Sequence, residues 1–392
     1  MNYILFDESA TRQNFLPFTF TRPVSEIRIG ILTIREKWEK ISGQKKVSVI
    51  TEDYLAKKYP LYISAKEDNV WINSSLLPAT ELLKSINQLK KNECLKNEDL
   101  LIAINTGKEK FNGSSAKAKS IEWKGKPLLQ LKHLWDIFSL NGEALEQDFK
   151  LLTKGKKSAK ASKTNTLLGK YIFIEKGAKI ECAILNSTTG PIYIGKDAEI
   201  MEGTFIRGPF ALCEGSSTKM GAKIYGPTTI GPHSKVGGEI SNSVIFGYSN
   251  KGHDGFLGNS VIGEWCNLGA DTNTSNLKNN YSAVDIYDHA TKKMVPTGLT
   301  FCGLMMGDHS KCGINTMFNT GTVVGVCANI FGGDFPPKFI PSFSWGGSAG
   351  FIPYQLDKAF ETAERVFERR HKVFDETEKG ILKKVFSLTV KS

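Results

Sequence analysis

Apolar or small residues recur at every sixth position over much of the chain beyond residue 166. Eight of them follow one another without a break, and the spacing returns in two later stretches. The positions are Ile194, Ile200, Ile206, Leu212, Thr218, Ile224, Ile230 and Val236, then Ile262 and Leu268, then Met306, Cys312, Phe318, Val324 and Ile330. In a β-helix each six-residue repeat supplies one side of a coil, and the periodic residues stack inside it. The spacing therefore predicts a β-helix in this half of the chain.

Glycine frequently follows the periodic residue. These glycines are Gly195, Gly231, Gly263, Gly269, Gly307, Gly313 and Gly325. Glycine adopts backbone angles that other residues avoid. We therefore expect these glycines to lie at the corners of the coils and to take unusual backbone angles there.

The first 150 residues have a different texture. Short β-rich runs at 3–6, 47–50 and 100–104 alternate with amphipathic stretches such as residues 31–41. Alternation of strands with helices is typical of a parallel α/β sheet. Residues 154–166, KGKKSAKASKTNT, are rich in lysine and lack large apolar side chains, as a solvated linker does.

Two further segments depart from the six-residue period. Residues 269–300 are polar, and a long excursion from a regular coil is more often functional than accidental. After Pro353, apolar residues spaced by three and four predict an amphipathic helix that packs on the coil or on another subunit. They are Leu356, Ala359, Phe360, Ala363, Val366 and Phe367. The predicted parts are therefore an α/β domain (1–153), a linker (154–166), a β-helix (167–350) and a C-terminal helix (351–392).

Composition narrows the class of partner. The 392 residues include 51 Lys and Arg against 40 Asp and Glu, a net charge of +11, which favours anionic ligands such as nucleotides and sugar phosphates. There is no arginine-rich arm, zinc-finger spacing or aromatic RNA-binding motif, so we expect no nucleic acid partner. The seven cysteines are scattered and include no CxxC pair, which is typical of a reducing compartment. No signal peptide and no apolar run of ~18 to 20 residues is present, so we expect a soluble, cytoplasmic protein without membrane contact.

The segment 249–276, SNKGHDGFLGNSVIGEWCNLGADTNTSN, carries a composite motif. It resembles the acetyltransferase half of the bifunctional bacterial family that acetylates glucosamine-1-phosphate and then uridylylates the product. The matching places are His253, Phe256, Leu257-Gly258, the run 267–270 and Asn276. The resemblance extends over most of residues 190–335 and implies a left-handed β-helix and a homotrimer.

The resemblance also implies roles for residues. His253 would be the general base, because a neutral imidazole suits proton removal from the attacking amine at neutral pH. The residues implied to bind the amino-sugar phosphate are Asn267, Asn276, Lys219, Lys223 and Phe256, the last in place of the family's tyrosine. The residues implied to contact acetyl-CoA are Ile314, Asn315 and Gly332. A basic position of the family falls at Ser241, and His309 is predicted to be a corner residue.

The N-terminal half resembles the sugar-phosphate nucleotidylyltransferase signature in LPFTFTRPVSEI, residues 16–27. The residues that fit it are Arg12, Pro17, Thr21, Arg22 and Pro23, of which Arg12, Thr21 and Arg22 are implied to bind the nucleotide. Three features depart from the signature. The glycine-rich loop is replaced by FDESATR, the expected lysine is Val24, and the strand ends offer Asn73 and Asn105 where a metal carboxylate is expected. A divergent bacterial branch of the bifunctional family shows a similar pattern, and it implies UTP and Mg²⁺ as further ligands.

Several functions are compatible with these sequence patterns. The preferred hypothesis is acetyl-CoA-dependent N-acetylation of an amino-sugar phosphate, coupled to a domain that forms UDP-N-acetylglucosamine. One alternative is a nucleotidylyltransferase whose β-helix serves assembly or regulation. Others are an acetyltransferase for a different sugar acceptor with an inactive N-terminal domain, and a module that binds a sugar nucleotide without turning it over.

Overall fold

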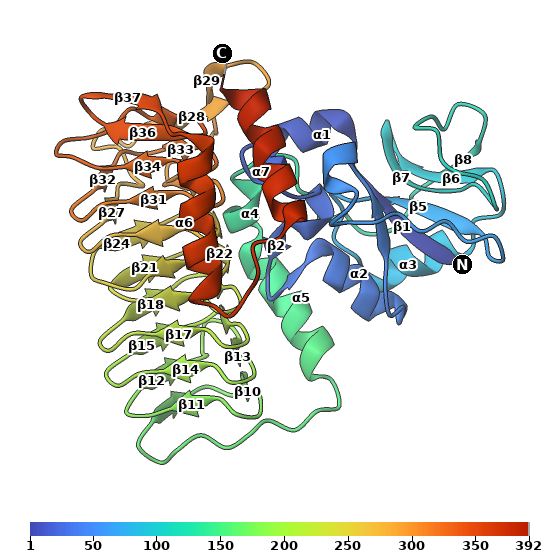
Figure 1. Cartoon of the computed structure of the whole chain (residues 1–392). Coiled ribbons are helices and arrows are strands. Elements are labelled where there is room, and N and C mark those ends of the chain that lie inside the picture. The colour runs from blue at the N-terminus through green and yellow to red at the C-terminus, as the bar shows by residue number, and fades with distance from the viewer. Residues whose placement is uncertain (391–392) are drawn as a thin grey trace. The chain divides into compact units, whose positions relative to one another are not determined.

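The computed structural model describes residues 1–390 and divides by its internal contacts into two compact units (Figure 1). The first unit contains residues 1–15, 22–27 and 32–133, and the second contains residues 16–21, 28–31 and 134 onward. Two short N-terminal segments and the helix at 141–153 therefore group with the second unit. In the residues described, no helix is both long and apolar enough to cross a membrane.

A six-stranded sheet forms the centre of the first unit. Its strands in spatial order are β4 (Ser48–Ile50), β1 (Asn2–Phe6), β5 (Asn69–Asn73), β7 (Leu100–Asn105), β6 (Glu93–Asn97) and β8 (Lys119–Glu122). Strands β4, β1 and β5 are parallel, whereas β7 is antiparallel to both β5 and β6. The predicted parallel sheet is therefore confirmed for β4, β1 and β5, whereas β7 departs from the prediction. Only Glu98 and Asp99 separate β6 from β7, and so tight a turn forces the chain to reverse.

The helices of the first unit have sequence signals at their ends. They are α1 (Ser9–Asn14), α2 (Ile34–Ser42) and α3 (Thr80–Asn87), and short 3₁₀ helices lie at Val24–Glu26 and Asp53–Leu55. Helix α2 begins with a capping box, in which Thr33 and Glu36 bond to each other's backbone, and it ends at Gly43 with φ +73. Strand β3 (Leu32–Thr33) belongs to this unit, whereas β2 (Arg28–Ile29) belongs to the second.

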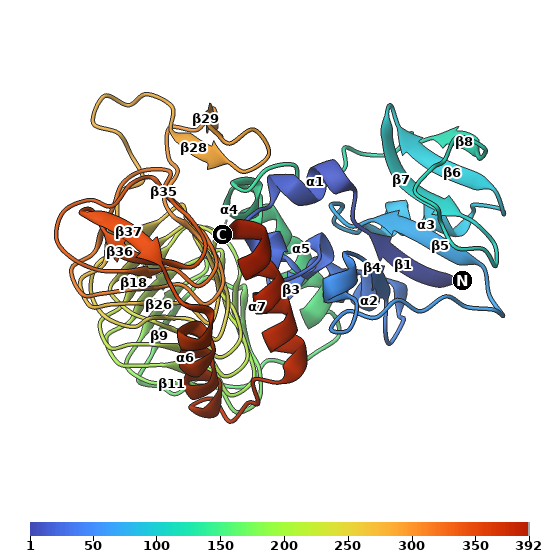
Figure 2. The same cartoon turned by 45° about the horizontal axis from the view of Figure 1, so that its top comes forward.

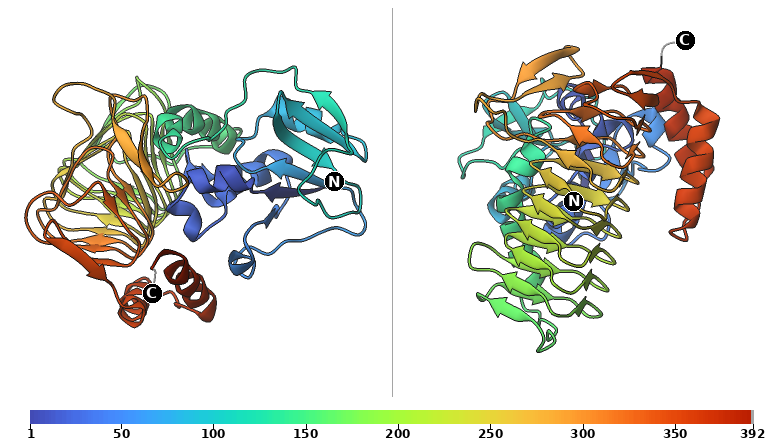
Figure 3. Two further views of the ribbon diagram at one scale, coloured as in Figure 1. Left: turned by 90° about the horizontal axis from the view of Figure 1, so that it is seen from above. Right: turned by 90° about the vertical axis from the view of Figure 1, so that its left-hand side faces the viewer.

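The second unit is a parallel β-solenoid of three sheets (Figure 3). The first solenoid sheet contains β10 (Ile172–Ile174), β13 (Ile192–Ile194), β16 (Phe210–Leu212), β19 (Thr228–Ile230), β22 (Val244–Gly247), β25 (Val261–Glu264), β30 (Met305–Met306), β33 (Val323–Val324) and β35 (Phe339–Ile340). The second contains β11 (Lys179–Ile180), β14 (Glu199–Ile200), β17 (Ser217–Thr218), β20 (Lys235–Val236), β23 (Asn250–Lys251), β26 (Asn267–Leu268), β31 (Lys311–Cys312), β34 (Asn329–Ile330), β36 (Ser344–Gly347) and the antiparallel β37 (Gly350–Pro353).

The third solenoid sheet contains β9 (Thr166–Leu168), β12 (Ile184–Asn186), β15 (Phe205–Arg207), β18 (Lys223–Tyr225), β21 (Glu239–Ser241) and β24 (Phe256–Gly258). A further parallel pair joins β27 (Asn273–Thr274) to β32 (Met317–Phe318). A hairpin of β28 (Asp285–Asp288) and β29 (Lys293–Pro296) lies within the polar excursion predicted from the sequence. All the periodic residues are buried, from Ile194 to Ile330, so the predicted β-helix is confirmed.

The glycines that follow the periodic residues, except Gly263, come directly after a strand, at the corners of the coils as predicted, but their backbone angles differ from the prediction. None of the seven has a positive φ, and the left-handed residue lies two positions later, for example at Asp197, His233 and Trp265. A Cβ added at Gly195 would lie 2.7 Å from the backbone nitrogen of Glu214 in the next coil. These glycines are therefore required by the close approach of successive coils, and the prediction of unusual backbone angles is wrong.

Helices complete the second unit. Short helix α4 (Asp136–Ser139) and α5 (Asn141–Thr153) precede the solenoid, and α6 (Leu356–Glu368) and α7 (Glu376–Thr389) follow it (Figures 1 and 2). The single predicted C-terminal helix is thus two, and Pro353 ends β37 instead of beginning a helix. Helix α6 packs on the coil through Phe367, whose ring stacks 3.9 Å from Trp265. A 3₁₀ helix at Phe18–Phe20 also belongs to this unit, and Phe18 contacts Phe246.

Residues 154–165 form no helix or strand, as expected of a linker. Part of the segment is nevertheless bound to the first coil. The hydroxyl of Ser158 accepts from the amide of Ile174, and the amide of Ala159 donates to the carbonyl of Ile174. The boundaries between the predicted domains stay a prediction.

Candidate functional site

One column of turns gathers several of the residues predicted for acetyl transfer. These turns follow strands of the second solenoid sheet and lead to the third sheet, at 219–222, 237–238 and 252–255, or to the β27–β32 pair, at 269–272 and 313–316. We call the column the 2–3 edge. Successive turns touch: a Cβ added at Gly237 would lie 3.1 Å from Cβ of Lys219 on one side and 2.6 Å from the carbonyl of Gly252 on the other. Predicted residues on this edge are Lys219, His253, Ile314 and Asn315, with Gly332 directly after β34.

His253 lies on the turn 252–255, Gly-His-Asp-Gly, and its side chain is exposed. The turn rests on a shorter one, Gly237-Gly238. A Cβ added at Gly238, which has φ +74, would lie 2.9 Å from Cα of Asp254 and 3.0 Å from the carbonyl oxygen of His253. The close support of the His253 turn therefore depends on a glycine at position 238.

A buried lysine lies directly inside this turn. Lys251 occupies an interior position of the second sheet, and its ammonium donates to the carbonyl oxygens of His253 at 2.6 Å and Asp254 at 2.8 Å. Sequence reasoning missed this residue. The available signal was the continued six-residue spacing from Ile245 through Lys251 to Leu257.

Phe256 on β24 and Asn276 after β27 come together. A Cβ added at Gly258 would lie 2.6 Å from Nδ2 of Asn276 and would also contact the ring of Phe256. The Asn276 amide donates to Oδ1 of Asn259 at 2.8 Å, which fixes its orientation. An aromatic face and a carboxamide thus lie next to each other at β24, the strand that directly follows the His253 turn.

Asn267 is not brought to that pair. It lies exposed on β26 of the second sheet, where its Oδ1 accepts from Nδ2 of Asn250 at 3.4 Å. Oδ1 of Asn250 accepts in turn from Arg370, which follows α6. Asn267 therefore faces the C-terminal segment, while its proposed role in the site stays a prediction.

A cavity of about 700 Å³ lies on the third sheet beside Lys223. Its charged lining consists of Arg207 and Lys223, and Phe205 and Tyr225 supply aromatic surface. The hydrogen bond to the carboxylate of Glu239 raises the pKa of Tyr225 to about 12, so this phenol stays neutral at physiological pH. Sequence reasoning did not find Arg207, because nothing in the local motif distinguishes it from other surface cations.

Lys223 and Phe256 share one column on the outer face of the third sheet. Lys223 pairs with Glu239, and Glu239 pairs with Phe256. Two strand spacings separate the two backbones, about 10 Å. The cavity lined by Arg207 and Lys223 and the pair of Phe256 and Asn276 are therefore neighbouring parts of one face.

The first unit has a second candidate site at the carboxyl ends of β1 and β4. A cavity of about 600 Å³ is lined there by Asp7, Arg12, Thr51 and Lys110, among others. Ligands of parallel α/β sheets bind outside the carboxyl ends of the strands, so the position suits a nucleotide. Arg12 and Lys110 supply the positive charge that phosphates require.

Asp7 occupies the place where a glycine-rich loop was expected. Its carboxylate accepts from the amide of Val24 at 3.2 Å, from the hydroxyls of Ser74 at 2.7 Å and Thr51 at 3.1 Å, and from Arg12 at 3.3 Å. Burial raises the pKa of Asp7, and the charge of Arg12 opposes that rise.

The guanidinium of Arg12 also donates to the carbonyl of Arg22 at 3.1 Å, which brings two of the predicted residues together. Thr21 is not with them. It belongs to the second unit, where its hydroxyl donates to Asp308 at 2.6 Å.

The residues at these strand ends do not fit a Mg²⁺ ion. The oxygens of Asp7 already accept from four donors, and the amides of Asn73 and Asn105 are bonded to backbone groups. Within residues 1–390, no group of three or more His, Cys, Asp or Glu side chains is placed to hold a metal ion. We therefore assign no step to a metal.

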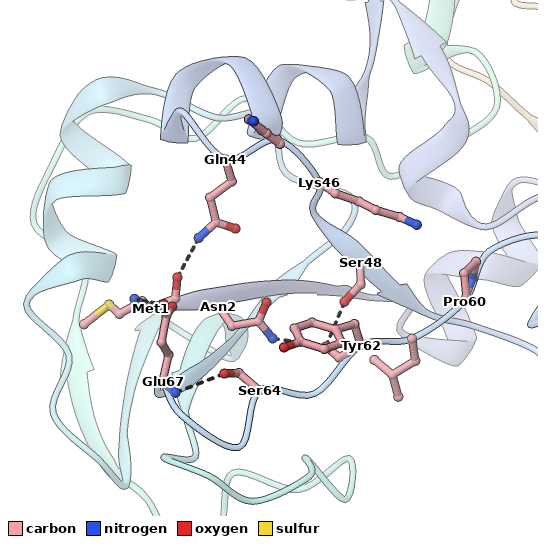
Figure 4. Close-up of a pocket in the computed structure, with 11 residues that line it drawn as sticks. Met1, Asn2, Gln44, Lys46, Ser48, Pro60, Tyr62, Ser64 and Glu67 are labelled. Carbon is pink, nitrogen blue, oxygen red and sulfur yellow. Dashed lines mark hydrogen bonds and ion pairs between the residues drawn. The ribbon is translucent and has the colours of Figure 1, made fainter.

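A third cavity, of about 680 Å³, lies at the opposite, amino end of β1 (Figure 4). Its polar groups largely bond to one another: Gln44 donates to the carbonyl of Met1, and both Asn2 and Ser48 donate to the carbonyl of Tyr62. It contains none of the predicted site residues, and it lies away from the strand ends at which α/β domains bind nucleotides.

Comparison with known proteins identifies a matching family for the N-terminal part of the chain and several relatives. Residues 3–157 match the model of a family described as sugar nucleotidyl transferase. The chain is similar to a bifunctional sugar-1-phosphate nucleotidylyltransferase/acetyltransferase of Sulfurisphaera tokodaii, with 32% identity over 146 residues, which cover 37% of this chain and 36% of the relative. It is also similar to the bifunctional protein GlmU of Methanocaldococcus jannaschii, with 34% identity over 87 residues, or 22% and 21% of the two chains.

A third relative is the uncharacterized acetyltransferase YaiX of Escherichia coli O6:K15:H31, with 28% identity over 153 residues, or 38% of this chain and 66% of the relative. The matched part thus spans about a third of the first relative's length.

Among solved structures, the polySia-specific acetyltransferase NeuO has a TM-score of 0.30 and 16% identity over 54% of this chain and 99% of its own. An Arabidopsis UDP-N-acetylglucosamine acyltransferase has a TM-score of 0.25 and 14% identity over 58% and 92%. The molecule combines an α/β domain matched by the sugar nucleotidyl transferase family with a hexapeptide-repeat β-solenoid and C-terminal helices, which confirms the predicted fold class.

Proposed function

We propose that the solenoid is an acetyl-CoA-dependent N-acetyltransferase for an amino-sugar phosphate, with glucosamine-1-phosphate as the preferred acceptor. The α/β domain would convert the acetylated product into UDP-N-acetylglucosamine. The observation that supports acetyl transfer is the 2–3 edge, along which His253 and the residues proposed to contact acetyl-CoA follow one another in nearby coils although they span residues 253–332.

The proposed chemistry needs one base and two binding regions. The amine nitrogen of the sugar attacks the thioester carbonyl carbon, a C–N bond forms and the C–S bond breaks. His253 takes the proton that the nitrogen loses, and the thiolate of CoA leaves and is protonated. The imidazole of His253 is exposed, and its backbone turn is held by Lys251 from the interior and by Gly238 of the preceding coil. Such a fixed, accessible imidazole suits this role.

The third sheet would hold the sugar phosphate. Phe256 offers an apolar face to the sugar ring, and Asn276 offers a carboxamide that can bond to hydroxyl or carbonyl oxygens without added charge. Arg207 and Lys223 line the adjoining cavity and would bind the phosphate. Ser241 cannot contribute a charge, so the cations of this cavity replace the basic position expected there.

Acetyl-CoA would lie along the later coils. Ile314 is 69% exposed, which leaves an apolar surface for the acyl arm, and Asn315 lies beside it with φ +56. Gly332 has φ +101, and a Cβ built on it would meet nothing within 4 Å, so the backbone there is open to a ligand. We propose that a second subunit of a homotrimer closes this groove.

For the α/β domain we propose uridylyl transfer at the cavity beside Arg12. A phosphate oxygen of the acetylated sugar would attack the α-phosphorus of UTP, and pyrophosphate would leave. The family match at residues 3–157 supports the reaction class, and Arg12 and Lys110 support phosphate binding. The saturated hydrogen bonds of Asp7 favour the alternative that this domain binds a nucleotide without transferring it.

The test follows thiol release from acetyl-CoA against a panel of amino-sugar phosphates, and then pyrophosphate after UTP and Mg²⁺ are added. We expect thiol release with glucosamine-1-phosphate and then pyrophosphate. Release of thiol without pyrophosphate would mean that the α/β domain binds the nucleotide without transferring it. No thiol release with any acceptor would contradict the proposal.

His253→Ala should lower acetyl transfer by about 10²-fold or more, since general-base catalysis contributes that much. His371→Ala, which removes another exposed imidazole, is the matched control and should leave the rate unchanged. An unchanged rate in His253→Ala would remove this residue from the mechanism.

A further inference from the structure

Lys251 is buried in the interior of the solenoid, with 1% of its surface exposed. It pairs with Val236 on the neighbouring strand of the second sheet and so continues the column of interior side chains. An apolar side chain would fill that position without the cost of desolvating a charge. Packing alone therefore does not account for a lysine at this position.

The ammonium of Lys251 is fully occupied by backbone acceptors. It donates to the carbonyl oxygens of His253 at 2.6 Å, of Asp254 at 2.8 Å and of Gly237 at 3.5 Å. An ammonium has three donors and no acceptor, so three converging carbonyls satisfy it. Burial lowers the pKa of Lys251 to about 8, and the negative charges of Asp254 and Asp271 oppose that shift.

The turn that Lys251 supports differs from its neighbours on the 2–3 edge. In the turns 269–272 and 313–316 the third residue is left-handed, Asp271 and Asn315, and the hydroxyl of a threonine in fourth place donates to the first carbonyl. In the turn 252–255 the left-handed residue is Gly255, with φ +108, and no threonine is present. The turn 252–255 thus has a different backbone shape from its neighbours, and its carbonyls accept from Lys251 instead of from a threonine of the turn.

We propose that Lys251 is a positioning residue for His253. Its ammonium holds the carbonyls of His253 and Asp254 toward the interior, and this fixes the direction in which the imidazole leaves the solenoid. The proposal rests on the proposed acetyl transfer, and it adds the residue that builds the special turn.

The first test compares Lys251→Met, which keeps an unbranched side chain one atom shorter and removes every donor, with Ile200→Ala. Ile200 lies in the same interior column, three coils before Lys251 and so away from the His253 turn, and its truncation leaves a cavity that should lower stability. We expect Lys251→Met to reduce kcat by about tenfold to 10²-fold with little change in KM for acetyl-CoA, since a small displacement of a reacting group has effects of that size. Ile200→Ala should lower the melting temperature and leave kcat unchanged.

A second readout does not depend on activity. Diethyl pyrocarbonate modifies accessible imidazoles, and peptide mass mapping gives the rate at His253, with His371 as the internal reference. We expect the relative rate at His253 to change several-fold in Lys251→Met and to stay constant in Ile200→Ala. Wild-type kcat together with an unchanged modification rate in Lys251→Met would overturn the proposal.

A second substitution covers the case in which Lys251→Met does not fold. Lys251→Leu also places an apolar side chain in the interior and leaves Gly255 unchanged. We expect it to fold with a displaced His253 turn and reduced acetyl transfer, and full activity would overturn the proposal. If the wild-type protein acetylates no acceptor, the proposed function fails, while the modification rate of His253 still decides whether Lys251 positions it.

Discussion

Single residues shape the His253 turn from two sides, Lys251 from within and Gly238 from the preceding coil. The contacts of Gly238 provide a test that separates backbone strain from steric support. Its φ is +74, and a Cβ there would press on the turn of the next coil. On the same edge Gly221 has φ +72, but a Cβ there would meet nothing within 4 Å.

We therefore expect Gly238→Ala to lower both stability and acetyl transfer. The left-handed backbone costs about 1–2 kcal/mol in either alanine variant, and only at position 238 does the new methyl displace the His253 turn. Gly221→Ala should lose a similar amount of stability and keep its kcat. Denaturant unfolding and steady-state kinetics measure the two effects, and equal kcat values in both variants would contradict this interpretation.

At the cavity proposed to bind the nucleotide, the residue to test is Arg12. Its partner Asp7 has a side chain only 4% exposed, so Arg12→Met leaves a buried carboxylate without its cation. We expect the variant to lose about 3–5 kcal/mol at pH 7, the usual cost of removing one member of a buried pair. The pKa of Asp7, already raised by burial, should rise further, so the folded state binds a proton more readily and part of the loss is recovered as the pH falls.

Lys110→Met is the matched control, because Lys110 lines the same cavity with an exposed side chain. Its stability should change by less than about 0.5 kcal/mol, while its affinity for UTP falls as in Arg12→Met. Retention of UTP affinity by both variants would show that this cavity does not bind the nucleotide.

Among the elements, the β28–β29 hairpin contains a histidine that packs among aromatic rings. The ring of His289 meets those of Tyr287 at 5.3 Å, Phe339 at 5.4 Å and Phe20 at 5.8 Å, all with nearly perpendicular planes. Burial lowers the pKa of His289 to about 4, although the charge of Asp288 opposes this.

The folded state therefore binds this proton less readily than the unfolded chain, whose histidine titrates near pH 6.5. Stability from neutral His289 is present above pH 6.5 and is lost as the pH falls toward 4, by about 3 kcal/mol in total. His289→Phe keeps an aromatic ring and cannot be protonated, so it should flatten the pH dependence of unfolding in this window. The same slope in both proteins would mean that His289 is not the titrating group.

For the whole molecule, the outer face of the third sheet bears on assembly. Ile184, Phe205 and Tyr225 are exposed there beside Arg207 and Lys223 of the cavity, and a group of exposed apolar side chains marks an association face. We expect a homotrimer with a mass of about 130 kDa, three times the 43.3 kDa of one chain. Light scattering on Phe205→Glu should show a lower mass, because the change places charge in that face, whereas Tyr281→Glu in the polar excursion should not. A wild-type mass of one chain would contradict the trimer.

The sequence by itself determined the solenoid, because every coil repeats the same burial requirement at the same spacing. It did not reveal the exceptions, since Lys251 violates the apolar pattern, and only the three carbonyls gathered around its ammonium explain its presence. Likewise Thr21 lies in a motif with Arg12 and Arg22, yet its hydroxyl is bound to Asp308, 287 residues away.

The same limit applies to the sheet and the glycines. Strand positions in the α/β domain follow from local β-rich runs, but the reversal of β7 relative to β6 occurs at the two-residue turn of Glu98 and Asp99. Glycine after each periodic residue was visible in the sequence, whereas the reason for it, the backbone of the next coil a few ångströms away, exists only once the coils are stacked. Periodicity is a local property that one sequence records in full, while close approach and hydrogen bonding between distant residues are decided only by the tertiary structure.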